Sequence, residues 1–384
     1  MGHSCENVGT MIDRRQFIGL GGCTLGVVAL GGMATGANAS YSVAILGDTH
    51  YDAEPESVYH AHYDRSNPLA KIQAAEFCRN GEMWRTRCRR LLAASGGLAK
   101  EKPTDFVLQL GDLIQGDCDD VETHRRMLAD CCELFRSAYP VGLPFLTVVG
   151  NHDVRGKGAH EAYFAFAEAF LARQLGKDVK YPVVSFRKGN DLWILCDFEM
   201  RDLTPLIAEL EKASDARYVF VVTHGPFTAP EGAFPAWRLG GAQLCDSLRA
   251  RLYEALSRRR AIVLSGHTHS TAFYRHENKW GGFCEYTANS VWKSEEFATD
   301  KPIASDPSEY GLWVKGNLVG RFKEEFERAA PEFQSNLKEY FMNKGAGHSR
   351  LSVSEAGVEV EFYPGDVTRH PKVFPLCGAA SGLR

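Results

Sequence analysis

The sequence predicts an α/β protein in which buried strands alternate with helices. Short, nearly continuous apolar runs recur along the chain, as is typical of strands that are covered on both faces. Longer stretches with helical periodicity separate most of these runs. The chain has 384 residues, of which 44% are hydrophobic and 24% charged, so it can bury a sizeable core. The strand-like runs are 42–46, 106–110, 145–149, 192–196, 218–222 and 261–265.

Helical periodicity and turn signals define the other elements. We expect a hairpin over 183–196, because Gly189 and Asn190 form a turn signal between two apolar runs. Residues 283–292 predict one more strand, and residues 351–363 predict a second hairpin. The expected helices cover about 81–101, 120–138, 158–175, 203–213 and 242–258.

An apolar stripe precedes the second hairpin. Its members recur at three- and four-residue steps, which predicts a helix that Pro331 interrupts and that ends near Gly345. We expect this helix to pack on the core, with a lid or a dimer surface as the alternative. The stripe consists of Leu318, Phe322, Phe326, Ala329, Phe333, Leu337 and Phe341.

The chain is expected to divide into four parts. Residues 1–39 form an export signal, and 40–292 form the core. Residues 293–350 form a partly helical insertion packed on that core. Residues 351–384 supply a hairpin that completes the fold, followed by a tail.

The first 39 residues resemble a twin-arginine export signal. Arg14 and Arg15 precede an apolar run, and 37–39 offer a small-residue cleavage site before Ser40. Met11 is then a candidate start, because the ten residues before it add nothing to the signal. The signal predicts a periplasmic or extracellular protein without stable membrane insertion after cleavage.

A membrane anchor and lipid attachment to Cys23 are the alternatives to a cleaved signal. The apolar run over 17–34 has about the minimum length for a membrane span, but six of its 18 residues are glycine. Cys23 lies only six residues into the run, which is early for a lipidated cysteine. The cleaved signal is therefore the preferred interpretation.

Cysteine usage and net charge exclude some classes of protein. Removal of residues 1–39 leaves nine of the 11 cysteines, at irregular spacing. This predicts mostly buried thiols rather than a disulfide framework, with one or two surface bridges as the alternative. The net charge of −4 is a poor match for a nucleic-acid backbone, so we expect no binding to a nucleic-acid scaffold.

Polar residues directly follow five of the predicted strands. In open α/β sheets, ligands bind at the carboxyl ends of the strands. The set holds carboxylates, an amide and imidazoles but no thiolate, and such donors suit Mn, Fe or Zn at a catalytic site. Seven donors are too many for one ion with an open position, and they predict two ions that share a carboxylate. The donors are Asp48, His50, Asp112, Asn151, His224, His267 and His269.

The order of these motifs resembles that of the calcineurin-like metallophosphoesterase superfamily. The pattern of that family is DxH, GD, GNH[DE], a lone His and GHxH, and each motif is present between residues 43 and 292. The resemblance implies a two-sheet β-sandwich flanked by helices. It also implies metal-dependent hydrolysis of a phosphate ester, either a monoester or a diester.

The resemblance implies a role for each donor. One ion would be held by Asp48, His50 and His269, a second by Asn151, His224 and His267, and Asp112 would bridge both. Two ions about 3.5–4 Å apart can hold a hydroxide and neutralise the charge of an in-line displacement.

The residues that follow Asn151 have different expected roles. His152 would stay off the metals and face the substrate. With a pKa near its ordinary value of about 6.5, it would be partly protonated and act as a general acid or a phosphate-binding group. Asp153 either orients a metal ligand or caps the following turn.

Differences from the family pattern exclude some of its subfamilies. The second motif lacks the GDxxDRG form of protein Ser/Thr phosphatases, and the third ends in Asp153 rather than Glu. Gln115 stands where purple acid phosphatases place a tyrosine ligand and where many relatives place an acid that positions the catalytic histidine. Asp52 or Asp117 is expected to substitute for that acid.

Two other functions compete with this interpretation. A nuclease or nucleotide hydrolase of the same superfamily is one, although the acidic balance and the export signal disfavour genomic DNA. A non-catalytic interaction module is the other, and the complete donor set disfavours it.

The sequence leaves the substrate, the native metals and the oligomeric state open. A small phosphorylated molecule is expected, held by residues from 51–79 and from the loop after His224. Packing within the loops is an equally expected role for these residues. The candidates are Tyr51, His60, His62, Trp237 and Arg238.

Overall fold

The computed structural model describes residues 40–52, 79–118, 120–228, 238–239, 246–312 and 321–378. The predicted export signal lies outside these residues. Among the described residues, no helix has the length and apolar character needed to cross a membrane.

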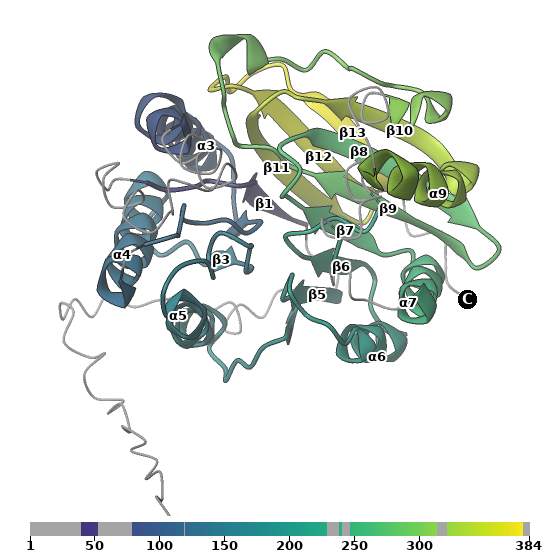
Figure 1. Ribbon diagram of the computed structural model, residues 1–384, viewed down its shortest axis with the longest axis horizontal. Coiled ribbons are helices and arrows are strands. Elements are labelled where there is room, and N and C mark those ends of the chain that lie inside the picture. Colours follow the sequence, from purple (N-terminus) through teal and green to yellow (C-terminus); the bar gives the residue numbers. More distant parts are fainter. Residues whose placement is uncertain are drawn as a thin grey trace, which may run out of the picture.

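The described strands form two sheets (Figure 1). The six-stranded sheet has the order β13-β12-β11-β1-β2-β3, and the seven-stranded sheet has the order β10-β8-β9-β7-β6-β5-β4. The first sheet contains β1 (Tyr41–Leu46), β2 (Phe106–Gln109), β3 (Phe145–Thr147), β11 (Gly347–Ser354), β12 (Gly357–Pro364) and β13 (Lys372–Gly378). The second contains β4 (Val183–Lys188), β5 (Asp191–Cys196), β6 (Val219–Val222), β7 (Ile262–Ser265), β8 (Thr271–Asn278), β9 (Gly281–Thr287) and β10 (Leu337–Asn343).

Helices flank both sheets (Figure 1). On the first sheet, α3 contacts β1 and β11, α5 contacts β3, and α4 packs between α3 and α5. On the second sheet, α6 contacts β4 and β5, α7 contacts β8 and β9, and α9 contacts β8. A short π-helix, Trp84–Cys88, leads into α3. The helices are α3 (Arg89–Glu101), α4 (Val121–Ala138), α5 (Ala159–Leu175), α6 (Thr204–Lys212), α7 (Asp246–Arg258) and α9 (Arg321–Asn336).

The core lies between the sheets and beneath the helices. Trp193 of β5 stacks on Phe220 of β6 with ring centroids 4.0 Å apart, and Phe106 of β2 meets Trp193 edge-on from the opposite sheet. A separate apolar cluster joins the outer face of the second sheet to α6 and α7. This architecture confirms the predicted α/β sandwich with flanking helices.

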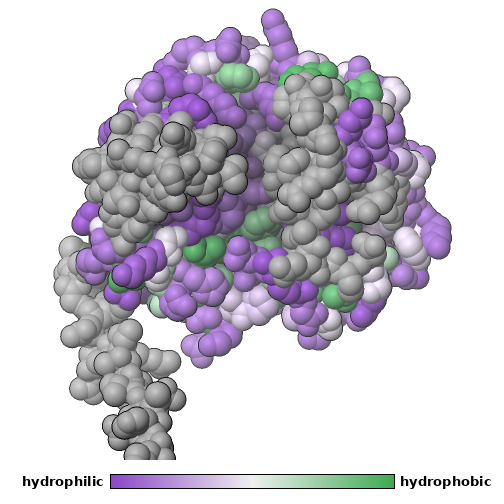
Figure 2. All heavy atoms as spheres, viewed as in Figure 1, coloured by the Kyte–Doolittle hydropathy of each residue, from purple (hydrophilic) through white to green (hydrophobic). Residues whose placement is uncertain are grey.

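Parallel pairing places the carboxyl ends of neighbouring strands at the same edge of each sheet. β1, β2 and β3 are parallel neighbours, and so are β5, β6 and β7. The carboxyl ends of the strands in each set therefore point the same way. The hairpin expected over 183–196 is present as the antiparallel pair β4 and β5. In the surface view, hydrophilic residues line much of a central hollow (Figure 2).

The predicted apolar helix is wrong beyond residue 336. α9 continues through Pro331, and the chain then forms β10, which pairs antiparallel with β8. Phe341 of β10 packs on Phe374 of β13 at a ring distance of 4.9 Å. Pairing along the edge of β8 and burial between the sheets thus override the helical periodicity. Residues 293–350 supply a strand of the second sheet and part of β11, and the division of the chain at 292 and 350 stays a prediction.

The strand expected over 283–292 ends earlier, at Thr287. Beyond it, Asn289 Oδ1 accepts a hydrogen bond from Val291 N, and Ser290 Oγ accepts one from Gly47 N. Sheet pairing thus gives way to a local turn at Asn289 and to a contact of Ser290 with the loop after β1. The strands β8, β10 and β13 were not foreseen.

The described cysteines carry free thiols, as predicted. Five are buried, and Cys132 and Cys377 are partly exposed. The buried ones are Cys88, Cys118, Cys131, Cys196 and Cys284.

Buried neutral histidines make the fold sensitive to acid. Burial lowers the pKa of His276 from 6.5 to about 3, and its Nε2 lies 2.8 Å from the Thr228 hydroxyl. Below pH 6.5 the unfolded chain takes up a proton that the folded chain refuses, so stability falls as the pH falls. His276→Gln should therefore remove a loss of about 1.4 kcal/mol per pH unit below pH 6.5. Urea unfolding of both proteins at pH 7 and pH 5 tests this. An equal loss of stability in the two proteins would contradict it.

Candidate metal centre

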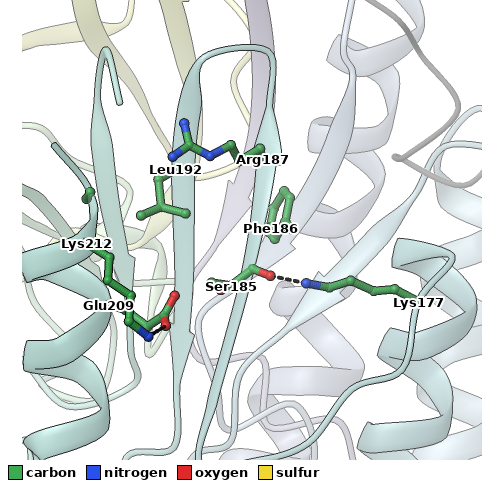
Figure 3. Close-up of a pocket in the computed structure, with 8 residues that line it drawn as sticks. Lys177, Ser185, Phe186, Arg187, Leu192, Glu209 and Lys212 are labelled. Carbon is green, nitrogen blue, oxygen red and sulfur yellow. Dashed lines mark hydrogen bonds and ion pairs between the residues drawn. The ribbon is translucent and has the colours of Figure 1, made fainter. Parts of the chain in front are cut away.

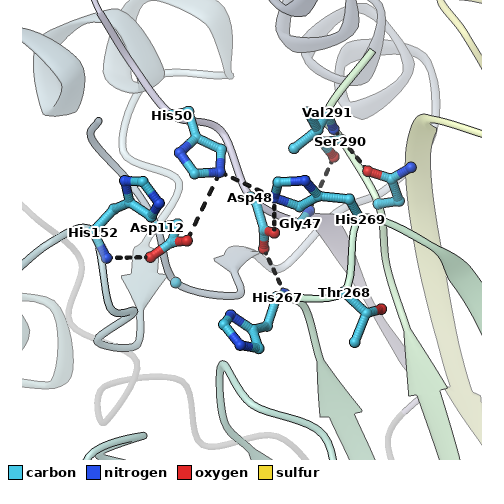
Figure 4. A network of polar contacts seen from close by, with 12 residues as sticks. Gly47, Asp48, His50, Asp112, His152, His267, Thr268, His269, Ser290 and Val291 are labelled. Atoms are coloured by element: carbon cyan, nitrogen blue, oxygen red, sulfur yellow. Dashed lines mark hydrogen bonds and ion pairs between the residues drawn. The ribbon is translucent and has the colours of Figure 1, made fainter. Parts of the chain in front are cut away.

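Five strand ends place their polar residues around one point. The loops after β1, β2 and β3 come from the first sheet, and those after β6 and β7 come from the second. In Figure 4 the side chains of Asp48, His50, Asp112, His152 and His269 converge, and the backbone N–H of His267 donates to Asp48. The structure thus brings together all seven donors that the sequence singles out.

One donor cluster consists of Asp48, His50 and His269. Nε2 of His269 lies 3.1 Å from Oδ2 of Asp48 and 3.2 Å from Nε2 of His50. Asp48 is fully buried, and its Oδ2 accepts no hydrogen bond from the described residues. A buried carboxylate oxygen and two imidazole nitrogens thus converge on one position.

A second donor cluster consists of Asp112, His224 and His267. Nε2 of His224 lies 3.2 Å from Oδ2 of Asp112, 3.0 Å from Nδ1 of His267 and 3.2 Å from Oδ1 of Asn151. Nδ1 of His224 lies 2.8 Å from the carbonyl oxygen of Leu110 and donates to it. This bond leaves Nε2 facing the cluster.

Asp112 lies between the two clusters. Its Oδ2 is 3.2 Å from Nε2 of His224 and 3.8 Å from Nε2 of His50. Its Oδ1 accepts a hydrogen bond of 2.7 Å from His152 N. A single carboxylate therefore reaches donors from both sheets.

Four donors have left-handed backbones. The φ angles are 43° at His50, 51° at Asp112, 70° at His267 and 48° at His269. At His267 the turn is closed by a bond of 2.8 Å from Thr268 N to the Gly266 carbonyl, which is a strained γ-turn geometry. Backbone strain of this kind is found at functional sites, where surrounding contacts hold it.

Two glycines allow the loops to approach each other. A Cβ on Gly150 would lie 2.2 Å from Asp112 N, and one on Gly266 would lie 2.4 Å from Oδ1 of Asp48. These distances are far below contact distance, so any side chain there would push the carboxylates out of position.

The charge balance of the site favours a cation. Burial opposes protonation of His224, but Asp112 and Asp48 outweigh it and raise the pKa of His224 to about 9. The neighbouring His224 and His152 hold the pKa of Asp112 well below its ordinary value, against the effect of burial. Two buried carboxylates thus draw positive charge into the site, and the oxygen and nitrogen donors fit transition-metal ions.

The comparisons with known proteins agree with this geometry. The family model described as calcineurin-like phosphoesterase matches residues 41–271. The chain belongs to the calcineurin-like phosphoesterase family. The match spans more than half of the chain and ends just after His269, the last of the seven donors.

One solved structure, that of PhoD, shares the fold of this chain, and two others are less similar. The structure of PhoD is 13% identical with a TM-score of 0.51, over 91% of this chain and 72% of that one. GAP50, the anchor in the inner membrane complex of Plasmodium, is 13% identical with a TM-score of 0.46, over 88% and 89%. A dimetal phosphatase from Danio rerio is 12% identical with a TM-score of 0.48, over 88% and 99%. No curated protein matches the chain by sequence.

His152 is buried beside the donors. Its ring meets that of His50 edge-on at 4.6 Å. Burial lowers its pKa well below 6.5, and the carboxylate of Asp112 only partly opposes this. The expectation of an ordinary pKa is therefore wrong for this imidazole, because the sequence does not reveal its burial.

The groups that contact His152 differ from the acid, Asp52 or Asp117, that was expected to position it. Its Nδ1 lies 2.9 Å from the carbonyl oxygen of Gln115, and its Nε2 lies 3.2 Å from Nη1 of Arg155. A guanidinium only donates, so Nε2 accepts and the proton lies on Nδ1. Asp117 pairs with Arg155 instead, at 3.2 Å, and Asp52 lies against Gly81.

Asp153 forms hydrogen bonds to two loops of the site. Its Oδ1 accepts from Ile114 N at 3.1 Å and its Oδ2 from Gly150 N at 2.9 Å. Burial and the neighbouring Asp112 raise its pKa to about 8. It therefore ties the Asp112 loop to the turn after β3, a role that combines the two expected ones.

Two of the five predicted substrate residues are described, and both have packing contacts. Tyr51 is buried, meets Trp84 edge-on at 5.1 Å and bridges to Ile114. Arg238 is buried with its guanidinium over Phe333. His60, His62 and Trp237 lie outside the described residues. A substrate role for these five residues stays a prediction.

Sequence reasoning missed Gln109 and Arg155. Gln109 is fully buried, and its amide reaches the Gly47 and Gly111 carbonyls while its Oε1 accepts from the Thr147 hydroxyl at 2.6 Å. It thus links the ends of all three parallel strands of the first sheet. A polar residue inside the apolar run FVLQL was the available signal.

A pocket of about 300 Å³ lies away from this site, beside β4, β5 and α6 (Figure 3). Its three cationic side chains already have acceptors. Lys177 donates to the Ser185 carbonyl, Arg187 pairs with Asp215 at 2.6 Å and Lys212 pairs with Glu209 at 3.2 Å. Each cation of the pocket thus already has an acceptor, and none of the seven donors lines it.

Proposed function

We propose that this chain is an exported phosphoric-ester hydrolase that uses two transition-metal ions. The observation that carries the proposal is the placement of Asp112 between two clusters of buried and partly buried donors. One cluster alone is compatible with a structural ion, but two that share a carboxylate match the requirements of phosphoryl chemistry.

The roles of the residues follow from their positions. One ion would be held by Asp48, His50 and His269. The other would be held by Asn151, His224 and His267. Asp112 would bind both ions. When bound, such ions supply a water activated at neutral pH and positive charge for the phosphoryl oxygens. The Leu110 carbonyl fixes the tautomer of His224, and Asp153 keeps the Asp112 loop in place.

His152 is proposed to assist the departing group. It lies beside His50 and its backbone N–H binds Asp112, so its ring is fixed next to the donors. A phosphate dianion beside the ring raises the pKa of the imidazole. The ring then donates a proton to the leaving oxygen or binds the phosphate.

A substrate screen tests the proposed function. Protein loaded with Mn, Fe or Zn should hydrolyse members of a panel of phosphomonoesters, phosphodiesters and nucleotides. Activity should disappear with a chelator and return with metal. Activity on nucleotides alone would identify a nucleotide hydrolase, and no hydrolysis of any ester by fully loaded protein would contradict the proposal.

Export is a separate part of the proposal. Replacing Arg14 and Arg15 with Lys keeps the charge but should leave the precursor in the cytoplasm, because the arginine pair is read by a receptor. Cell fractionation and the mature N-terminus, expected at Ser40, provide the measurement. Normal export of the Lys-Lys form would refute the twin-arginine assignment, while another N-terminus would refute only the cleavage site.

A further inference from the structure

Arg155 places a cation beside the reactive side of His152. Its Nη1 lies 3.2 Å from Nε2 of His152, the ring nitrogen that does not face Gln115. About a third of the Arg155 side chain is exposed, whereas His152 is buried. The guanidinium thus lies between solvent and the imidazole.

The loops around Arg155 hold this side chain in place. Asp117 N donates to the Arg155 carbonyl at 2.8 Å, and Cys118 bridges to Gly156. Asp117 has a left-handed backbone with φ of 54°, and its carboxylate lies 3.2 Å from Nε of Arg155. This ion pair holds the guanidinium beside His152, and Nη1 faces the ring.

We propose that Arg155 binds a non-bridging oxygen of the substrate's phosphoryl group, and that Asp117 positions it for this contact. The inference deepens the proposed function and rests on it. A guanidinium matches phosphate oxygens in geometry and charge. Its Nη1 now donates to a neutral imidazole nitrogen, and a phosphate oxygen is a stronger acceptor at the same place.

The binding of inorganic phosphate tests the proposal. Phosphate shares the non-bridging oxygens of the substrate but has no leaving group. Arg155→Ala should weaken phosphate binding about 10- to 100-fold, both as an inhibition constant and by calorimetry on metal-loaded protein. KM for a phosphate ester should rise in parallel. Added guanidinium ion should restore part of the loss, and Arg155→Lys should lie between Ala and wild type.

Controls separate this role from its alternatives. Arg187→Ala removes another ion-paired arginine, at the edge strand β4, and should change neither phosphate binding nor KM. Arg155→Lys keeps the test valid if the Ala variant fails to fold or to retain metal. Unchanged phosphate binding with a lower kcat would show that Arg155 acts through His152, and the proposal would be wrong. Failure of the wild type to hydrolyse any ester would instead remove the proposed function itself.

Discussion

Replacing Asp112 with Asn is expected to release both metal ions and abolish hydrolysis. Its Oδ2 lies within 4 Å of a histidine of each cluster, so the change weakens both sites at once. Loss of one neutral hydrogen-bond donor from an active site costs about 10²–10³-fold in rate. Loss of a shared anionic ligand should cost more than about 10³-fold. Elemental analysis and initial rates on the same preparation measure both effects.

Asp191→Asn is the matched control for this substitution. Asp191 is also fully buried, but it pairs with Arg217 at 2.6 Å at the start of β5, away from the donors. The control variant should lose stability but keep its metal. Full metal content in Asp112→Asn and in His267→Ala would refute the ligand assignment.

Replacing His152 with Ala should slow hydrolysis according to the leaving group. General acid catalysis typically contributes about 10²–10⁴-fold. An alkoxide of high pKa needs a proton as it departs, whereas a nitrophenolate barely does. The variant should therefore lose much of its activity on an alkyl phosphate ester and clearly less on a nitrophenyl ester. Rates on both esters, at matched metal content, provide the comparison.

An equal loss on both esters would give His152 a different role. It would then act as an electrostatic or binding group, and the general-acid assignment would fail. The Arg155 variants make this distinction sharper, because phosphate binding should follow Arg155 while leaving-group dependence follows His152.

The sequence predicts the site better than it predicts the sheets. Asp48, Asp112 and His267 each follow an apolar run, and the rule that strand ends share an edge is enough to group them. Strand β10 escaped prediction because its apolar residues also fit a helical period. Its conformation depends on β8 and β13, which are distant in the sequence.

The surroundings of the site were less accessible from the sequence. The positions of Gln109, Asp153 and Arg155 depend on which loops lie side by side, and local patterns do not encode that. The burial of His152, which lowers the pKa of its ring, also depends on contacts between loops, here those after β1, β2 and β3. The sequence around His152 does not encode these contacts.

The metal content of active wild-type protein tests the central claim most directly. Protein purified without chelators should contain about two transition-metal ions per chain, and its phosphoesterase activity should fall with metal content as a chelator removes them. Full activity with fewer than one ion per chain, or activity that persists after complete removal of metal, would contradict a dinuclear site built around Asp112.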